Sequence, residues 1–145
     1  MNQLYTCLSE LINVDLVDCI EKAGMKLELH FRIHKESNEE AYKKLIERIG
    51  TITIKQDNDQ FPLIYLEFKS YIGDSILNES YTIWDDYEAF EGKIFRVFKR
   101  SRYLDFIQAG TIATTEHPGP FKHYGIAALN HIVDIVSTDE PQIYI

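Results

Sequence analysis

The chain has 145 residues, of which 45% are hydrophobic and 26% are charged, and its formal net charge is −8. These proportions are typical of globular proteins and exclude a disordered chain, a collagen-like repeat and a disulfide-dense scaffold. A chain of this length suits one hydrophobic core, so we expect a single domain over residues 1–145.

Charge and cysteine content restrict the partners and the compartment. A uniformly acidic chain repels nucleic-acid phosphates and anionic lipid, so we expect binding to neither nucleic acid nor membrane. No apolar run approaches the roughly 20 residues of a membrane helix. Residues 1–18 carry no basic side chain, unlike a signal peptide, and the two cysteines lack the Cys-x-x-Cys spacing. Together these features predict a cytoplasmic protein.

The first third of the chain predicts one helix followed by strands. Leucine and isoleucine recur at helical spacing over residues 2–12, which predicts a short amphipathic helix. Residues 14–22 suit either a strand or a second helix, and we favour a strand that turns at residues 21–24. Residues 25–34 then alternate apolar and polar side chains, the strongest strand pattern in the chain. We expect one face of this strand to be buried and the other to be exposed to solvent.

The middle of the chain predicts a helix and several strands. The capping box that starts at Ser37 predicts a helix with an apolar stripe, and Gly50 is a natural C-terminal stop. Residues 51–55 are β-prone, and residues 57–60 predict a turn. Three further segments, rich in β-branched and aromatic residues, are expected to form strands: 63–69, 81–84 and 93–99.

The last third predicts one more helix and a pair of strands. Ser101 is expected to cap a short helix that Gly110 closes. Two prolines around a glycine make residues 117–120 a loop. Residues 123–136 suit two strands broken near 129–130, although a helix over 124–130 is the alternative. The predicted class is therefore α+β, with one mostly antiparallel β-sheet and two or three helices packed on it.

The motifs of common enzyme classes are missing. The sequence has no P-loop, dinucleotide-binding fingerprint, nucleophile elbow or zincin motif, so no cofactor is expected. His30 and His34 are four residues apart, which on a strand separates them by roughly 13 Å. One ion cannot bridge that distance with bonds of about 2 Å, so no metal site is expected.

Charge is unusually segregated around Gly92. Residues 74–91 contain acids but no base, and residues 93–102 contain bases but no acid. Either the two blocks pair with each other, or they form a surface for a partner. Aromatic side chains among the acids favour binding, because Trp and Tyr are enriched at interface hot spots and acids steer a basic partner. The candidate partner-binding residues are Asp74, Glu79, Trp84, Asp85, Asp86, Tyr87, Glu88 and Glu91.

A second polar group lies near the C-terminus. His123 and His131 could meet across a hairpin, with Tyr124 and Asp134 nearby. A structural His–Asp hydrogen bond is one interpretation, and a catalytic or ligand-binding cluster is the other. Three tyrosines and one arginine could also line a ligand pocket: Tyr87, Tyr103, Tyr124 and Arg96.

Residues 90–96 (FEGKIFR), 101–106 (SRYLDF), 123–124 and 130–135 (NHIVDI) resemble small uncharacterised proteins of Gram-positive bacteria. Some proteins of this sort are immunity partners of secreted polymorphic toxins. The resemblance implies a bacterial cytoplasmic protein that works by binding, and it carries no catalytic residue with it.

Composition and resemblance together lead to two functional hypotheses. The first is a non-enzymatic, immunity-type inhibitor that masks a basic partner, such as a toxin, with the acidic and aromatic surface. The alternative is a small enzyme or small-ligand-binding domain that uses the C-terminal His/Asp/Tyr cluster.

Overall fold

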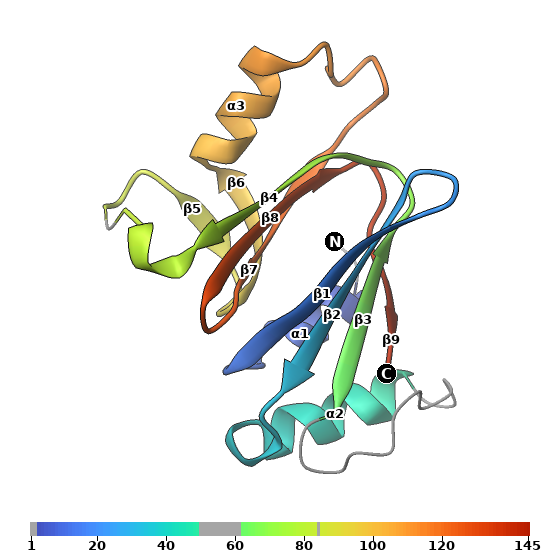
Figure 1. The fold of residues 1–145 in the computed structure, drawn as a ribbon, viewed down its shortest axis with the longest axis vertical. Coiled ribbons are helices and arrows are strands. Elements are labelled where there is room, and N and C mark those ends of the chain that lie inside the picture. The colour runs from blue at the N-terminus through green and yellow to red at the C-terminus, as the bar shows by residue number, and fades with distance from the viewer. Residues whose placement is uncertain (1–2, 50–61, 84) are drawn as a thin grey trace.

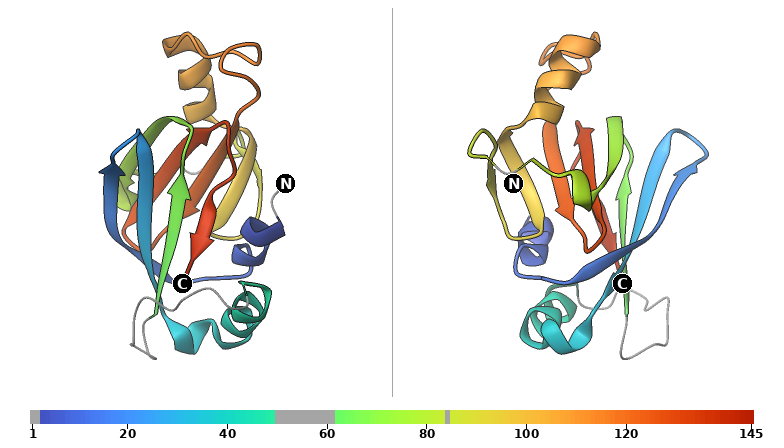
Figure 2. Two further views of the ribbon diagram at one scale, coloured as in Figure 1. Left: turned by 90° about the vertical axis from the view of Figure 1, so that its right-hand side faces the viewer. Right: turned by 60° about the vertical axis from the view of Figure 1, so that its left-hand side comes forward.

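The structure is a computed structural model that describes residues 3–49, 62–83 and 85–145. Within these residues two antiparallel β-sheets face each other, and the main hydrophobic core lies between them (Figures 1 and 2). The four-stranded sheet has the order β1-β2-β3-β9, and the five-stranded sheet has the order β4-β8-β7-β6-β5. The strands are β1 (Val14–Lys22), β2 (Lys26–Ile33), β3 (Leu63–Phe68), β4 (Tyr71–Asn78), β5 (Ala89–Glu91), β6 (Phe95–Arg100), β7 (Lys122–Ala127), β8 (His131–Ser137) and β9 (Gln142–Tyr144).

Helices occupy the two ends of this arrangement. In Figure 1, α3 stands at one end beyond the five-stranded sheet, and α2 lies at the opposite end. No helix in the described part of the chain is long and apolar enough to cross a membrane. The helices are α1 (Gln3–Leu8), α2 (Glu39–Ile49) and α3 (Arg102–Gly110), with short 3-10 helices η1 (Lys35–Ser37) and η2 (Glu79–Tyr81).

The predicted α+β class and antiparallel pairing are confirmed, but the prediction of one sheet is wrong. A period-two pattern shows which face of a strand is buried, yet it does not specify which strand lies beside it. After β3 the chain crosses from the four-stranded sheet to β4 in the five-stranded sheet. After β8 it returns as β9, which pairs with β3. The inner faces of both sheets therefore share one core, to which α1 and α2 add Tyr5, Leu8 and Leu45.

Aromatic side chains join the two sheets through the core. The ring of Phe31 on β2 lies 5.6 Å from that of Phe95 on β6. Phe68 on β3 lies 5.4 Å from Tyr124 on β7. Tyr5 of α1 closes one end, with its ring 5.1 Å from that of Tyr124. Such edge and tilted contacts contribute roughly 0.5–1.5 kcal/mol each beyond the area that they bury.

Several local predictions are confirmed. The strands over 14–22, 63–69 and 93–99 and the two strands either side of 129–130 are present with small boundary shifts. The N-terminal helix is also present, but it ends at Leu8 and not at residue 12. Ser101 caps α3, since its Oγ accepts a hydrogen bond from the backbone N–H of Leu104 at 3.0 Å. Residues 117–120 lie outside helices and strands.

Other local predictions are wrong. Tyr81 belongs to η2 and not to a strand, because the side chain of Asn78 accepts from the Ser80 N–H and starts a helical turn. The sequence pattern did not predict β4, an edge strand without a regular buried face. The helix expected after Ser37 is present as α2, but it begins at Glu39, and Ser37 itself lies in the preceding 3-10 helix η1. Gly50, residues 51–60 and Trp84 lie outside the described residues.

Gly92 makes the turn between β5 and β6, where the acidic and basic blocks meet. Its φ is +99°, a backbone conformation that residues with a side chain rarely adopt. An added Cβ would lie 2.1 Å from the carbonyl oxygen of Phe95. The turn folds the two blocks back on each other, so that Ala89 pairs with Arg100 and Glu91 pairs with Val97. Opposite charges are thereby placed on neighbouring strands.

Candidate functional site

The outer face of the five-stranded sheet carries a pocket of about 360 Å³ beside α3. Its floor comes from β6 and β8, through Arg96, Phe98, Ile132 and Asp134. One wall comes from α3, through Arg102, Tyr103 and Phe106. The rim comes from the end of β4 and the segment after it, through Leu77, Tyr81, Thr82, Ile83 and Glu88. The pocket therefore joins members of both predicted sets, Glu88 and Asp134.

Gly125 gives the pocket floor its shape. It pairs with Arg96 on one side and with Asp134 on the other, so these three residues form one row across the sheet. A Cβ at Gly125 would lie 2.4 Å from Cε2 of Phe98. Because Gly125 has no side chain, the Phe98 ring packs against the sheet at this position. It stacks on the His123 ring, with 4.2 Å between the two ring centroids.

Beneath the pocket, Ser101, His123 and Asp134 form a hydrogen-bonded chain. His123 Nδ1 lies 2.6 Å from Ser101 Oγ, and His123 Nε2 lies 2.6 Å from Asp134 Oδ1. The exposed fraction is 0% for Ser101 and 1% for His123. These residue types suggest a nucleophilic triad, but here the carboxylate faces the pocket and the serine is enclosed. The arrangement fixes the position of Asp134 and the start of α3.

The remaining members of the predicted C-terminal cluster do not join this chain. Tyr124 is buried in the core between the sheets. His131 pairs with Asn78, whereas His123 pairs with Val136, five residues further along β8. That separation is roughly 16 Å along the strand, so the two histidines share no cleft. The hypothesis of one His123–His131 cluster is therefore wrong, and the His123–Asp134 hydrogen bond is confirmed.

The acidic segment pairs partly with the basic block. Asp85 forms an ion pair with Arg102, and Glu91 Oε1 lies 3.8 Å from Lys99 Nζ. The Arg102 guanidinium also lies 5.1 Å from the ring centroid of Tyr87, whose hydroxyl donates to Asp105. The interpretation that the blocks neutralise each other is confirmed for these contacts.

Hydrogen bonding and burial shift the pKa of groups around the pocket. The hydrogen bond from Arg102 holds the pKa of Asp85 below its usual range. Burial lowers the pKa of Arg96, against the opposing effect of the Glu88 and Asp134 charges. Burial also raises the pKa of Tyr103 to about 12, so that its hydroxyl stays protonated at neutral pH.

Three of the candidate acids lie outside these pairs. Asp74 lies on β4, where burial and the nearby charge of Glu21 on β1 raise its pKa. Glu79 lies in η2 and is half-buried, while Asp86 is exposed in the loop before β5. For Asp86 no ion pair is recorded among the described residues. Glu79 and Asp86 each lie in the chain between two residues that line the pocket, whereas Asp74 does not.

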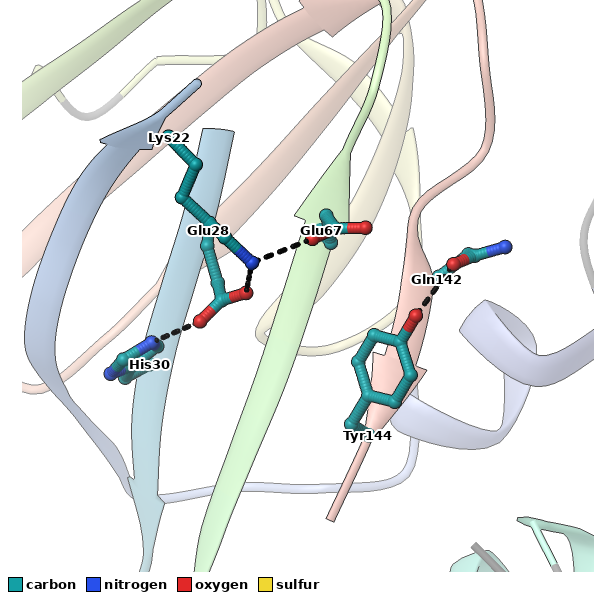
Figure 3. Close-up of polar contacts among 6 residues, drawn as sticks. All are labelled: Lys22, Glu28, His30, Glu67, Gln142 and Tyr144. Carbon is teal, nitrogen blue, oxygen red and sulfur yellow. Dashed lines mark hydrogen bonds and ion pairs between the residues drawn. The ribbon is translucent and has the colours of Figure 1, made fainter. Parts of the chain in front are cut away.

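A second charged cluster, which sequence analysis missed, lies on the outer face of the four-stranded sheet (Figure 3). Lys22 Nζ lies 3.0 Å from Glu28 Oε2 and 3.1 Å from Glu67 Oε2, and His30 Nε2 lies 2.8 Å from Glu28 Oε1. The polar face of β2 is consequently not the freely solvated face that its pattern predicted. The alternation of Glu28 and His30 was a visible signal, but the pairing with Glu67 was not.

No group of histidine, cysteine and acidic side chains that could hold a metal ion occurs among the residues that the structure describes. Comparison with known proteins found no matching family model, no matching curated protein and no matching solved structure.

Proposed function

We propose that this chain is a non-enzymatic binding protein of the immunity type, which inhibits a basic partner such as a toxin. The contact surface is formed by residues 79–83 and 85–91 together with the pocket beside α3. The observation that carries the proposal is the exposure of large apolar side chains around this charged pocket. Tyr81, Ile83 and Phe106 have exposed fractions of 75%, 64% and 61%. Apolar groups gathered in this way mark interaction sites more often than isolated ones do.

The charges of the segment support a basic partner. Asp86 and Glu79 lie in the same segment as the exposed Tyr81 and Ile83, and the whole chain carries a net charge of −8. Acids beside an apolar centre steer a basic partner and raise its association rate. Asp85 has a different role, since its pairing with Arg102 shapes the surface and does not leave its charge available.

The enclosed serine supports binding over hydrolysis. Ser101 Oγ both contacts His123 and accepts from the Leu104 N–H, so it serves as a helix cap. A nucleophile must reach a substrate atom, whereas this hydroxyl has an exposed fraction of 0%.

The test is affinity capture with the full chain as bait in its own host, followed by the association rate of the captured protein. Asp86→Lys is expected to slow association and to weaken its dependence on salt. Glu47→Lys is the matched control, because it makes the same charge change at an exposed position of α2, at the other end of the molecule. Equal association rates for the two variants would contradict the proposed surface.

A small-ligand-binding domain is the second candidate, favoured by the pocket itself. A volume of about 360 Å³ falls in the range of small-molecule sites. In this case Asp134 would face the ligand, and His123 would hold that carboxylate in place. A panel of metabolites measured by thermal shift would detect it: a compound that raises the Tm of the native chain but not of Phe106→Ala would favour this candidate.

A further inference from the structure

The charges that line the pocket beside α3 do not cancel. Arg102 is neutralised by its ion pair with Asp85. Glu88 and Asp134 then remain as two carboxylates against the single guanidinium of Arg96. The pocket therefore carries an excess negative charge, which favours a cationic occupant.

Arg96 is already held by other groups. Its guanidinium carbon lies 4.1 Å from the centroid of the Phe90 ring, and its Nε donates to the carbonyl oxygen of Lys93 at 2.6 Å. By contrast, among the described residues Glu88 Oε2 accepts a hydrogen bond from the exposed backbone N–H of Arg102 at 3.1 Å, and Asp134 Oδ1 accepts one from His123. Each carboxylate keeps a second oxygen with no hydrogen bond recorded among the described residues.

Aromatic rings line the same space. Tyr103 and Phe106 of α3 stack with their centroids 6.1 Å apart and their planes at 21°. Phe98 of β6 lies on the pocket floor. A planar cation that both stacks on rings and donates paired hydrogen bonds to carboxylates is a guanidinium group, and an ammonium group satisfies only part of this environment.

We infer that this pocket receives an arginine side chain of the basic partner, with its guanidinium between Asp134 and Glu88 and against the rings of α3. This inference rests on the proposed function, whose partner is basic. It adds the anchoring residue type and the pocket that the residue enters. His123 acts here as a positioning residue, because it fixes the Asp134 carboxylate from below.

The test is an NMR titration of the full, isotopically labelled chain with N-acetyl-arginine amide. We expect saturable shifts of the amides of Ile132, Asp134 and Tyr103, and weaker binding in high salt. N-acetyl-citrulline amide is the matched probe, since it has nearly the same shape without the charge. Equal shifts from both probes, shifts that map elsewhere, or no shifts would each overturn the inference.

Variants test the named groups separately. Glu88→Gln and Asp134→Asn are each expected to weaken binding of the arginine probe about fivefold. Phe106→Ala removes a ring that is largely exposed, so it tests the stacking without disturbing the core. If Asp134→Asn fails to fold, Glu88→Gln and Phe106→Ala still decide the matter. Glu47→Gln is the control, because Glu47 is an exposed acid on α2, away from the pocket and the proposed contact surface.

Failure of this inference can be distinguished from failure of the proposed function. If Asp86→Lys slows association of the captured partner but the chain does not bind the arginine probe, the pocket inference is rejected and the proposed function stands. A chain that binds the probe but whose association with every captured protein ignores Asp86→Lys would keep the pocket and reject the function.

Discussion

Glu28 and Glu67 lie directly opposite each other on β2 and β3, and both accept a hydrogen bond from the ammonium group of Lys22. Their exposed fractions are 8% and 7%, so water screens their repulsion poorly. Like charges in register destabilise a sheet unless a cation lies between them. Lys22 therefore bridges the facing acids of β2 and β3 on the outer face of the four-stranded sheet (Figure 3).

Removing that cation is expected to destabilise the fold. Lys22→Met leaves the Glu28 and Glu67 carboxylates facing each other, so the free energy of unfolding in urea should fall at neutral pH. The loss should shrink in the double variant with Glu67→Gln, because one charge is then absent. Lys26→Met is the control on the same sheet, since no ion pair is recorded for Lys26 in the described part of the chain. Equal losses for the two lysine variants would contradict the bridging role.

Glu28 should make stability depend on acid pH. Burial raises its pKa, but hydrogen bonds from His30 and Lys22 outweigh burial and hold the pKa below the ordinary 4.5. A folded-state pKa below the unfolded value contributes stability that is present above about pH 4.5 and is lost as the pH falls through the folded value. The free energy of unfolding measured across this range should fall less in Glu28→Gln than in the native chain. Parallel pH profiles would contradict this assignment.

Ser101→Ala should cost about 1–2 kcal/mol of stability. The substitution removes the cap of α3 at the Leu104 N–H and leaves His123 Nδ1 buried without its partner. Ser80→Ala is the control, because Ser80 is exposed and should change stability by less than about 0.5 kcal/mol. Urea unfolding of both variants measures the difference, and a Ser101→Ala value as small as that of Ser80→Ala would show that the hydrogen-bonded chain is dispensable.

Gly125→Ala should cost about 1–3 kcal/mol, because the new methyl group overlaps the Phe98 ring. Adding Phe98→Leu should recover part of that loss by removing the ring atoms in the way. At Gly110, the last residue of α3, an added Cβ meets Phe106 at an ordinary 3.4 Å, so Gly110→Ala should cost nothing or stabilise slightly. Thermal unfolding compares the three variants. Similar Tm values for Gly125→Ala and Gly110→Ala would show that Phe98 moves aside freely.

The candidate site was only partly predictable. The acidic segment and Asp134 were visible as charges, and Glu88 and Asp134 do line one pocket. These two residues are 46 positions apart in the chain (88 and 134). They meet because β6 and β7 lie between β5 and β8 in the sheet. Tyr124 and His131 were predicted beside His123, but the alternation of faces and the register of β7 on β8 separate them.

The sequence by itself determined the local structure. The period-two pattern specified β2, and the hydroxyl of Ser101 specified the start of α3, because both depend on residues within a few positions of each other. Only the tertiary structure decided that the strands form two sheets, that Lys22 bridges Glu28 and Glu67, and that a pocket opens beside α3. The physical reason is that hydrogen bonding between strands and burial between sheets join residues far apart in the chain. Periodicity shows which face of a strand is buried, but the strand that lies beside it is chosen by the packing of the whole core.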